Sequence, residues 1–253
     1  MQLGFLITTC KSYFQNVEDI INDIEKCFID KNHVLIVSAQ EDNFEDYYYR
    51  GVKIIKVPYT ALQLTGLVYL YENKKLLNSF NFWFVLPCTI KIGLDFNNKI
   101  IKFLNKNKEE DSIPIINPKL LPYRTMDMGI LKSDFINIMG EYLMKLKLKS
   151  YDDKDLLILK KQLIYDENII LGISPANPEL STKFNIKENY KSPKYFMVNN
   201  YDELESKILN HHNANKIKET TFLTIDLVKY QRCFKGMKNL VMDCDGKRPF
   251  YKQ

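Results

Sequence analysis

Two adjacent carboxylates, Asp166 and Glu167, are the first candidates for acid–base chemistry in this sequence. They follow a predicted helix over residues 152–164 and precede the apolar run 169–171. A carboxylate placed beside a hydroxyl group can remove its proton while the oxygen attacks an electrophile. The same side chains could instead accept hydrogen bonds from free backbone N–H groups at a helix start. The two interpretations are evenly balanced for Glu167, whereas the capping role suits Asp166 slightly better.

A third carboxylate, Asp127, lies between Met126 and Met128. A carboxylate in such apolar surroundings needs a partner or a function. It could bind a hydroxyl group of a ligand, or it could pair with Arg124, one of only four arginines in the chain. A guanidinium group also suits phosphate, which it can bind through two parallel hydrogen bonds. A structural ion pair between Asp127 and Arg124 explains both residues at least as well.

Polar residues follow three predicted strands, over residues 2–8, 33–38 and 82–86. The last of these contains Trp83 and is an unbroken apolar run, typical of a strand buried on both faces. It ends at Pro87, which has no N–H group to continue a sheet ladder. Ligands of open α/β sheets bind beyond the carboxyl ends of the strands. The polar residues that follow these strands could be ordinary solvated loops. If instead they bind a ligand, one cleft should contain Thr8, Thr9, Lys11, Asp42, Cys88 and Thr89.

The five cysteines indicate a reducing compartment, because their number is odd and no two have C-x-x-C spacing. Cys88 has no histidine nearby in the sequence, and His33, His211 and His212 form no recognisable triad or metal-binding pattern. We therefore interpret Cys88 as a small cleft or core residue and predict no metal ligands among these side chains.

The composition favours a soluble protein with a substantial core, since 45% of the 253 residues are hydrophobic. The net charge is +5, and the lysines are spread along the chain, which argues against nucleic-acid binding. The N-terminal segment has too short an apolar core for a signal peptide. No apolar run approaches the roughly 20 residues of a membrane helix. We expect a cytoplasmic protein without a transmembrane segment.

The order of predicted elements indicates a single α/β domain with a mainly parallel central sheet flanked by helices. A helix over residues 17–28, capped by Asn16, separates the first two strands, and a helix over 61–77 precedes the apolar strand. A further helix begins at Ser133, and a late strand covers residues 221–230. The chain contains neither G-x-G-x-x-G nor a P-loop, so a classical dinucleotide site is not supported.

Taken together, five segments resemble the GT-A class of glycosyltransferases, above all small viral and bacterial sugar transferases. Their order and spacing carry the resemblance, because no single motif is specific. The segments are LGFLITTCK (3–11), VLIVSAQED (34–42), FWFVLPCTIKIGLDF (82–96), MDMGILKSDF (126–135) and YDENIIL (165–171).

The resemblance implies transfer of a sugar from a nucleotide-diphosphate sugar, UDP- or GDP-linked, to a hydroxyl group of a glycan or glycoprotein. Residues 1–105 would form the nucleotide-binding half, and residues 106–253 the acceptor half with a C-terminal tail. Glu167, then Asp166, would be the catalytic base, and Asp127 would bind a sugar hydroxyl group. The polar strand exits and Arg124 would bind the donor. A viral source, and hence a host cytoplasm, fits the resemblance and the Lys- and Asn-rich composition.

The sequence departs from this class at Pro87-Cys88-Thr89, where many members have Asp-x-Asp. Two carboxylates there would hold Mn²⁺ or Mg²⁺ against the diphosphate, because hard cations prefer oxygen ligands. An active enzyme could work without a metal, or Asp95 could supply a carboxylate. Alternatively, the chain is a non-catalytic nucleotide-sugar or glycan-binding module derived from such an enzyme.

Overall fold

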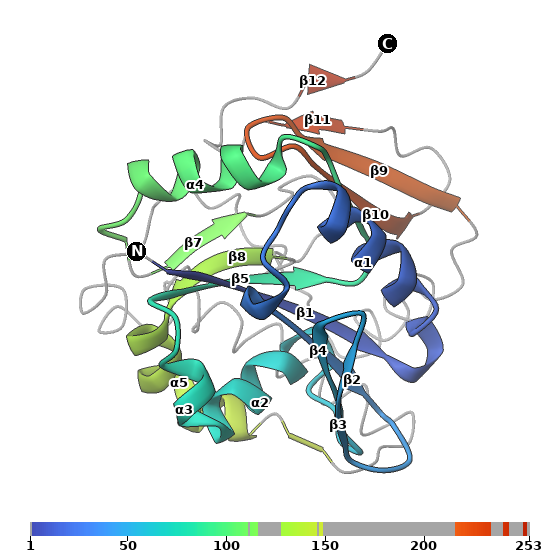
Figure 1. The fold of residues 1–253 in the computed structure, drawn as a ribbon, viewed down its shortest axis with the longest axis vertical. Coiled ribbons are helices and arrows are strands. Elements are labelled where there is room, and N and C mark those ends of the chain that lie inside the picture. Colours follow the sequence, from blue (N-terminus) through green and yellow to red (C-terminus); the bar gives the residue numbers. More distant parts are fainter. Residues whose placement is uncertain are drawn as a thin grey trace, which may run out of the picture.

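The structure of the protein, a computed structural model, describes residues 2–110, 112–115, 128–145, 147–148, 216–233, 240–242 and 250–251. Its main sheet has seven strands in the order β3-β4-β2-β1-β5-β8-β7 (Figure 1). The strands are β1 (Leu3–Cys10), β2 (Val34–Ala39), β3 (Glu45–Tyr49), β4 (Val52–Lys56), β5 (Phe82–Pro87), β7 (Ser112–Ile115) and β8 (Met128–Lys132).

The centre of this sheet is parallel, and its flanks are antiparallel. Strands β4, β2, β1 and β5 run in one direction. At one edge β3 pairs antiparallel to β4, and on the other side β8 runs antiparallel to both β5 and β7. The predicted α/β class with a mainly parallel central sheet is confirmed.

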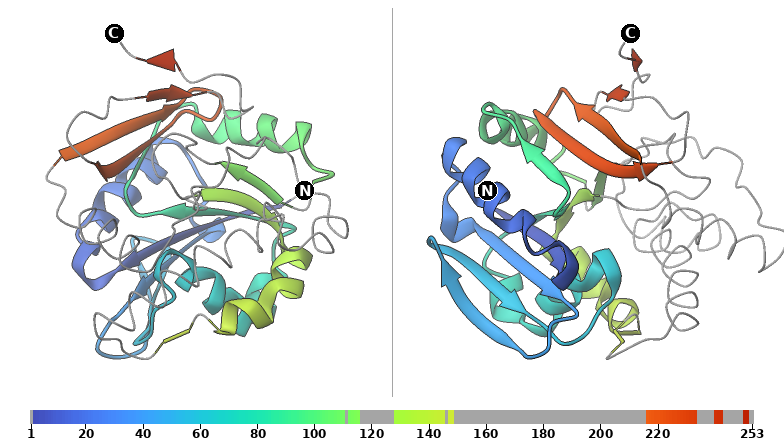
Figure 2. Two further views of the ribbon diagram at one scale, coloured as in Figure 1. Left: turned by 180° about the vertical axis from the view of Figure 1, so that it is seen from behind. Right: turned by 90° about the vertical axis from the view of Figure 1, so that its right-hand side faces the viewer.

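Helices cover both faces of the main sheet (Figures 1 and 2). On one face, α1 (Asn16–Lys26) and α4 (Phe96–Lys106) bury one apolar cluster. On the other face, α2 (Thr65–Glu72) and α5 (Ser133–Lys145) bury a second cluster. The short α3 (Lys74–Leu77) contributes Leu77 to the same cluster. Helices α1 and α4 each present one apolar stripe to the sheet, whereas α2 is buried over six consecutive residues, 65–70. Short 3₁₀ helices cover Lys11–Tyr13 (η1), Lys31–His33 (η2) and Leu62–Leu64 (η3).

A second sheet adjoins α4 and has the strand order β12-β11-β9-β10-β6. Its members are β6 (Ile90–Ile92), β9 (Lys216–Phe222), β10 (Leu227–Cys233), β11 (Leu240–Met242) and β12 (Phe250–Tyr251). Because β6 follows β5 after only two residues, the link Cys88-Thr89 connects the two sheets. The single strand predicted over 221–230 is wrong, since β9 and β10 form a hairpin whose turn includes Asp226 at φ +53°.

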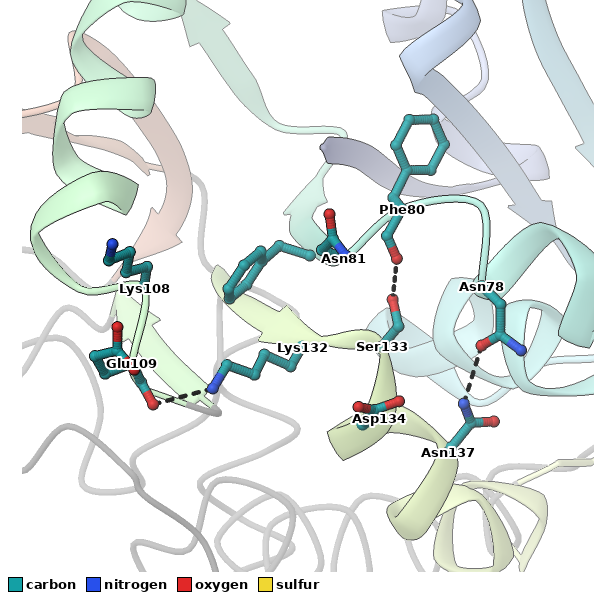
Figure 3. A pocket seen from close by; sticks show the side chains of 10 residues that line it. Asn78, Phe80, Asn81, Lys108, Glu109, Lys132, Ser133, Asp134 and Asn137 are labelled. Atoms are coloured by element: carbon teal, nitrogen blue, oxygen red, sulfur yellow. Dashed lines mark hydrogen bonds between the residues drawn. The ribbon is translucent and has the colours of Figure 1, made fainter. Parts of the chain in front are cut away.

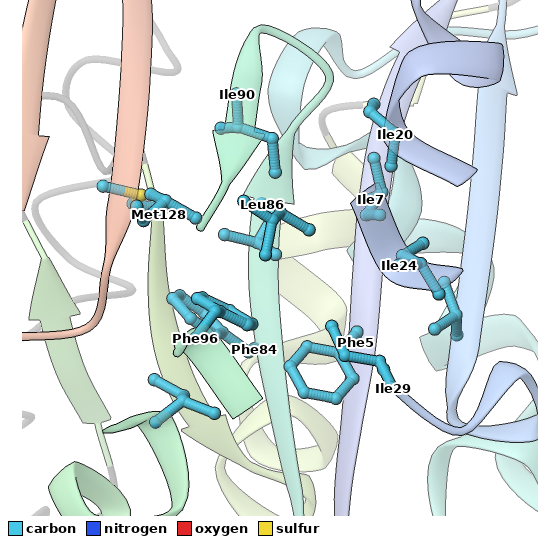
Figure 4. Close-up of a cluster of buried hydrophobic side chains, with 14 of the residues drawn as sticks. Phe5, Ile7, Ile20, Ile24, Ile29, Phe84, Leu86, Ile90, Phe96 and Met128 are labelled. Atoms are coloured by element: carbon cyan, nitrogen blue, oxygen red, sulfur yellow. The ribbon is translucent and has the colours of Figure 1, made fainter. Parts of the chain in front are cut away.

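The apolar strand predicted over 82–86 is confirmed as an interior strand, buried on both faces between β1 and β8. On one face the Phe84 ring stacks on Phe96 with 6.0 Å between centroids (Figure 4). On the other face Trp83 is 1% exposed and donates its indole N–H to the Leu77 carbonyl at 2.9 Å. The continuous apolar run therefore reflects two buried faces, as parallel sheets require.

Two elements differ from the sequence-based predictions. The helix predicted over 61–77 is interrupted at Asn73, whose side-chain amide donates to the Tyr69 carbonyl at 2.8 Å and ends α2. Strand β3 was not predicted, because four of its five residues are exposed and give no apolar pattern. Its ladder with β4 and the Lys53–Asp46 ion pair at 3.1 Å hold it instead.

No helix in the described part of the chain combines the length and the apolar character that crossing a membrane requires. The main sheet takes β7 and β8 from the sequence after residue 105. The division into halves at that residue stays a prediction.

Candidate functional site

The order of the parallel strands places a topological switch point between β1 and β5. From β1 the chain proceeds outward through β2 to β4, then returns to the other side of β1 as β5. The connections on the two sides of this point leave in opposite directions, which opens a crevice at the carboxyl ends of the strands. Thr8 pairs with Pro87 there, and the Cys88 N–H donates to the Thr8 carbonyl at 3.0 Å.

Cys88 lies against the β1 exit and the start of α1. Burial raises the pKa of its thiol, while the neighbouring Thr9 hydroxyl and the Asn16 side chain act in the opposite direction. A thiol with a raised pKa is a poor nucleophile at neutral pH. The interpretation of Cys88 as a small buried residue of the cleft wall therefore fits this environment, and Asn16 contributes to the same wall.

The Thr8 hydroxyl is turned to the opposite face of the sheet, toward α2. A side chain at Gly66 would place its Cβ only 2.6 Å from Thr8 Oγ1, so α2 can approach β1 because residue 66 is glycine. Thr8 and Thr9 are both buried, and neither hydroxyl has a hydrogen-bond partner of normal geometry within the described residues. Buried polar atoms without partners are uncommon and require an explanation. Here they border the switch point on both faces of the sheet.

The exit of β2 is a tightly bonded turn. Gln40 has φ +61°, and its N–H donates to the Tyr59 carbonyl at 3.1 Å. The Ser38 hydroxyl donates to Glu41 at 2.5 Å. Lys11 then reaches from the β1 exit to Asp42, with its Nζ 2.7 Å from each carboxylate oxygen. The predicted residues Lys11 and Asp42 are thus brought together, as an exposed ion pair.

Thr89 is fixed by the second sheet rather than by β1. Its carbonyl accepts a hydrogen bond from the Tyr230 N–H at 2.8 Å, where β10 pairs with β6. The switch point is therefore bordered by residues from both sheets. Of the predicted donor-binding set, the structure brings Thr8, Thr9, Lys11, Asp42, Cys88 and Thr89 to the carboxyl edge of β1, β2 and β5.

Asp95 lies away from this edge, at the other end of α1. Cys88 adjoins Asn16, the first residue of α1, whereas the Cys27 thiol beyond its last turn donates to the Gly93 carbonyl at 3.0 Å. A helix of 11 residues is about 16 Å long. Asp95 therefore does not replace the carboxylates missing beside Cys88.

The donor atoms at the carboxyl edge do not fit a Mn²⁺ or Mg²⁺ site. The acidic side chains that the structure describes after β2 are already engaged, Glu41 with Ser38 and Asp42 with Lys11. Cys88 is a poor ligand for these cations, which prefer oxygen. Within the described ranges, no three His, Cys, Asp or Glu side chains gather into a group that could hold a metal ion.

A separate cavity of about 650 Å³ lies at the amino end of β5, near the start of α5 (Figure 3). Several polar groups in its lining bind one another. Asn137 donates to Asn78 at 3.1 Å, Ser133 to the Phe80 carbonyl at 2.6 Å, and Lys132 to the Glu109 carbonyl at 3.0 Å. Because open α/β sheets bind ligands at their carboxyl edge, we place the candidate site at the switch point and not in this cavity.

Four predicted site residues, Glu167, Asp166, Asp127 and Arg124, lie outside the described residues. Their roles stay predictions. Sequence reasoning treated Asn16 only as a helix cap and overlooked Gly66. A glycine inside a helical pattern is the signal that could have revealed the close approach at Gly66.

No protein-family model matches the sequence, and no curated protein matches it. Among solved structures, the crystal structure of S. aureus TarS 1–349 matches with a TM-score of 0.35 and 9% sequence identity. The match covers 64% of this chain and 55% of that one, so the chain spans little more than half the length of the TarS structure. The assignment to a family stays a prediction.

Proposed function

We propose that the protein transfers a sugar from a nucleotide-diphosphate sugar to a hydroxyl group of a glycan or glycoprotein. The observation that carries the proposal is the switch point between β1 and β5, with polar residues from three strand exits around it. Such a crevice suits a nucleotide, because neighbouring exits can bind its separate parts. The resemblance of five sequence segments to GT-A glycosyltransferases supports the same conclusion.

The donor would lie along the exits of β1, β2 and β5. The Lys11 ammonium group can bind the diphosphate, which would compete with Asp42 for it. Since both side chains of this pair are more than half exposed, the pair contributes little to stability and can open at small cost. Thr9, which has no normal hydrogen bond within the described residues, can then donate to an oxygen of the donor.

In the reaction, the bond between the anomeric carbon and the diphosphate oxygen breaks, and the nucleoside diphosphate leaves with the bonding electrons. A new bond forms between that carbon and the acceptor oxygen. The acceptor proton passes to a carboxylate base, for which we propose Glu167, with Asp166 as the second candidate. Asp127 would bind a sugar hydroxyl group, and Arg124 a phosphate oxygen. No step uses a metal, because the described donor atoms at this edge do not fit one.

Calorimetric titration with a panel of UDP- and GDP-sugars, with and without Mn²⁺, tests the donor site. We expect binding that weakens about tenfold or more in Lys11→Met, since one charge-assisted contact to phosphate is lost. Lys75→Met, an exposed lysine on α3, is the matched control and should bind normally. If the full panel fails to bind wild-type protein, the proposal is wrong.

Single-turnover kinetics with Glu167→Gln test the catalytic base. The change keeps the shape of the side chain and removes its charge, so transfer should slow by about a hundredfold or more while donor affinity stays unchanged. Asp166→Asn is the neighbouring control. Normal turnover in Glu167→Gln would place the base elsewhere, and loss in Asp166→Asn alone would move the role to Asp166.

The same experiments separate an enzyme from a binding module. The missing Asp-x-Asp at Pro87-Cys88-Thr89 favours the module as the second candidate function. Donor binding without transfer to any acceptor in a broad glycan panel would support it. The cysteines Cys10, Cys27 and Cys88 are free thiols, which is consistent with the cytoplasmic location that we propose.

A further inference from the structure

Three large apolar side chains are exposed on three turns that meet near the start of α4. Phe28 follows α1 and is 89% exposed, Leu94 precedes α4 and is 74% exposed, and Leu223 lies in the β9–β10 turn and is 56% exposed. Single exposed apolar residues are common on soluble proteins. Three at adjoining turns form a set, here called the apolar tips, that indicates a binding surface.

Hydrogen bonds hold the three turns against one another. The Cys27 thiol donates to the Gly93 carbonyl at 3.0 Å, which joins the end of α1 to the turn before α4. The Gly93 N–H donates to the Asp226 carbonyl at 2.8 Å, and the Asp95 N–H to the Asp226 carboxylate at 2.9 Å. A Cβ at Gly93 would lie 2.2 Å from the Asp226 side chain, so the turns are in close contact. The tips are therefore presented by a fixed platform.

Helix α4 continues this surface with positive charge. Its residues include Lys99, Lys102 and Lys106, which share one flank of the helix, and no acidic residue. Lys99 also reaches the Leu223 carbonyl at 3.4 Å, so the lysine row begins at the apolar tips. In Figures 1 and 2 the β9–β10 turn lies beside α4 on the outside of the molecule.

The acidic residues of the platform are largely turned to backbone groups. Asp23 accepts a hydrogen bond from the Ile92 N–H at 3.0 Å, and Asp226 binds the turn before α4. Asp95 is exposed, as is Asp30 two residues after Phe28, and the exposed Lys26 and Lys91 lie on the neighbouring elements. The surface thus combines protruding apolar side chains with a row of α4 lysines that no acidic residue of that helix accompanies.

We propose that this surface docks the protein on an anionic lipid bilayer, with the apolar tips among the acyl chains and the α4 lysines at the headgroups. Apolar side chains inserted at the interface and lysines near anionic lipids are the two contributions that peripheral binding requires. A nucleic acid would use the lysines but would leave aliphatic Leu94 and Leu223 without partners. The lipid surface explains both parts of the set.

The proposed docking leaves the switch point free. The apolar tips lie at the end of α1, whereas Cys88 and Thr9 lie at its start, about 16 Å away along the helix axis. Bilayer binding therefore does not depend on the proposed transferase activity, and either could fail without the other.

Vesicle co-sedimentation of the full chain tests the proposal. Vesicles of phosphatidylcholine alone are compared with vesicles containing about 30% phosphatidylserine, at about 0.1 M salt. We expect binding to the anionic vesicles that weakens as salt rises. A tip variant with Phe28→Asn, Leu94→Ser and Leu223→Ser should lower the affinity at least tenfold. Asparagine is chosen at position 28 because Phe28 has φ +53°, which asparagine tolerates well.

A lysine variant with Lys99→Gln, Lys102→Gln and Lys106→Gln should also bind at least tenfold more weakly and lose the salt dependence. The matched control, Phe44→Ser with Tyr48→Ser, removes exposed aromatic side chains around β3, far from α4 in Figures 1 and 2, and should bind as wild type. Trp83 fluorescence verifies that each variant is folded. The proposal is overturned if wild-type protein stays in the supernatant with anionic vesicles. It is also overturned if the tip variant binds the anionic vesicles normally. The same holds if the lysine variant binds the vesicles normally and loses affinity only for an RNA or DNA oligonucleotide.

Discussion

Replacing Thr8 by valine is expected to stabilise the folded protein. Thr8 is only 6% exposed, and its hydroxyl group lies against Gly66. This hydroxyl group has no hydrogen-bond partner within the described part of the chain. Burying such a group costs about 1–3 kcal/mol, and valine has the same shape without the hydroxyl. We therefore expect the free energy of unfolding to rise by about 1–2 kcal/mol. That corresponds to an increase of about 2–8 °C in melting temperature for a chain of this size.

Thr65→Val is the matched comparison, because Thr65 is also buried but its hydroxyl group is fully hydrogen-bonded. Its hydroxyl accepts the Ala61 N–H at 2.8 Å and donates to the Leu62 carbonyl at 2.7 Å. Removing it leaves two backbone groups without partners and should cost about 1–3 kcal/mol. Urea denaturation of both variants gives the two free energies. A destabilised Thr8→Val, similar to Thr65→Val, would refute the argument by showing that the Thr8 hydroxyl is partnered in solution.

Three further predictions concern packing and pH. Gly140→Ala should destabilise α5 by about 1–3 kcal/mol, because its Cβ would lie 1.7 Å from the Tyr71 ring. In a Tyr71→Ala background, urea denaturation should show the change to be neutral or stabilising. Emission of the sole tryptophan, Trp83, should be blue-shifted in the native state and move to longer wavelength on unfolding, since the indole is buried. Burial, and after it the negative charges of nearby carboxylates, raise the pKa of the Cys27 thiol from 9.0 to about 11. The folded state therefore holds the thiol proton more tightly than the unfolded state, and the stability that this contributes is complete below pH 9 and is lost as pH rises through 11. Cys27→Ala should flatten this alkaline decline of the unfolding free energy.

Much of the main sheet could be predicted from apolar runs, because its central strands are buried on both faces. The runs that became β1, β2 and β5 all belong to this class. Strand β3 could not be found in this way, since its stability comes from pairing and ion pairs at an exposed edge. The β9–β10 turn could not be recognised because it contains two apolar residues, Leu223 and Ile225, which resemble part of a strand. Leu223 is exposed at the surface, and Ile225 is buried in the core.

The candidate site was predictable where it depends on strand ends and not where it depends on the direction of loops. Thr9 and Cys88 meet because adjacent parallel strands end at one edge. Asp95 is only seven residues beyond Cys88, yet β6 carries it along α1 to the far end of the helix. Sequence distance does not reveal this direction, because β6 is oriented by pairing with β10, more than a hundred residues later.

That pairing has a consequence for synthesis on the ribosome. Ile92 of β6 pairs with Leu227 of β10, so β6 emerges 135 residues before its partner. At about 5–20 residues per second, the interval is roughly 7–27 s. Throughout that time β6 lacks this neighbour, and unpaired strand edges invite association with other chains. The nascent protein should therefore depend on chaperones most strongly between the completion of β6 and the arrival of the β9–β10 hairpin.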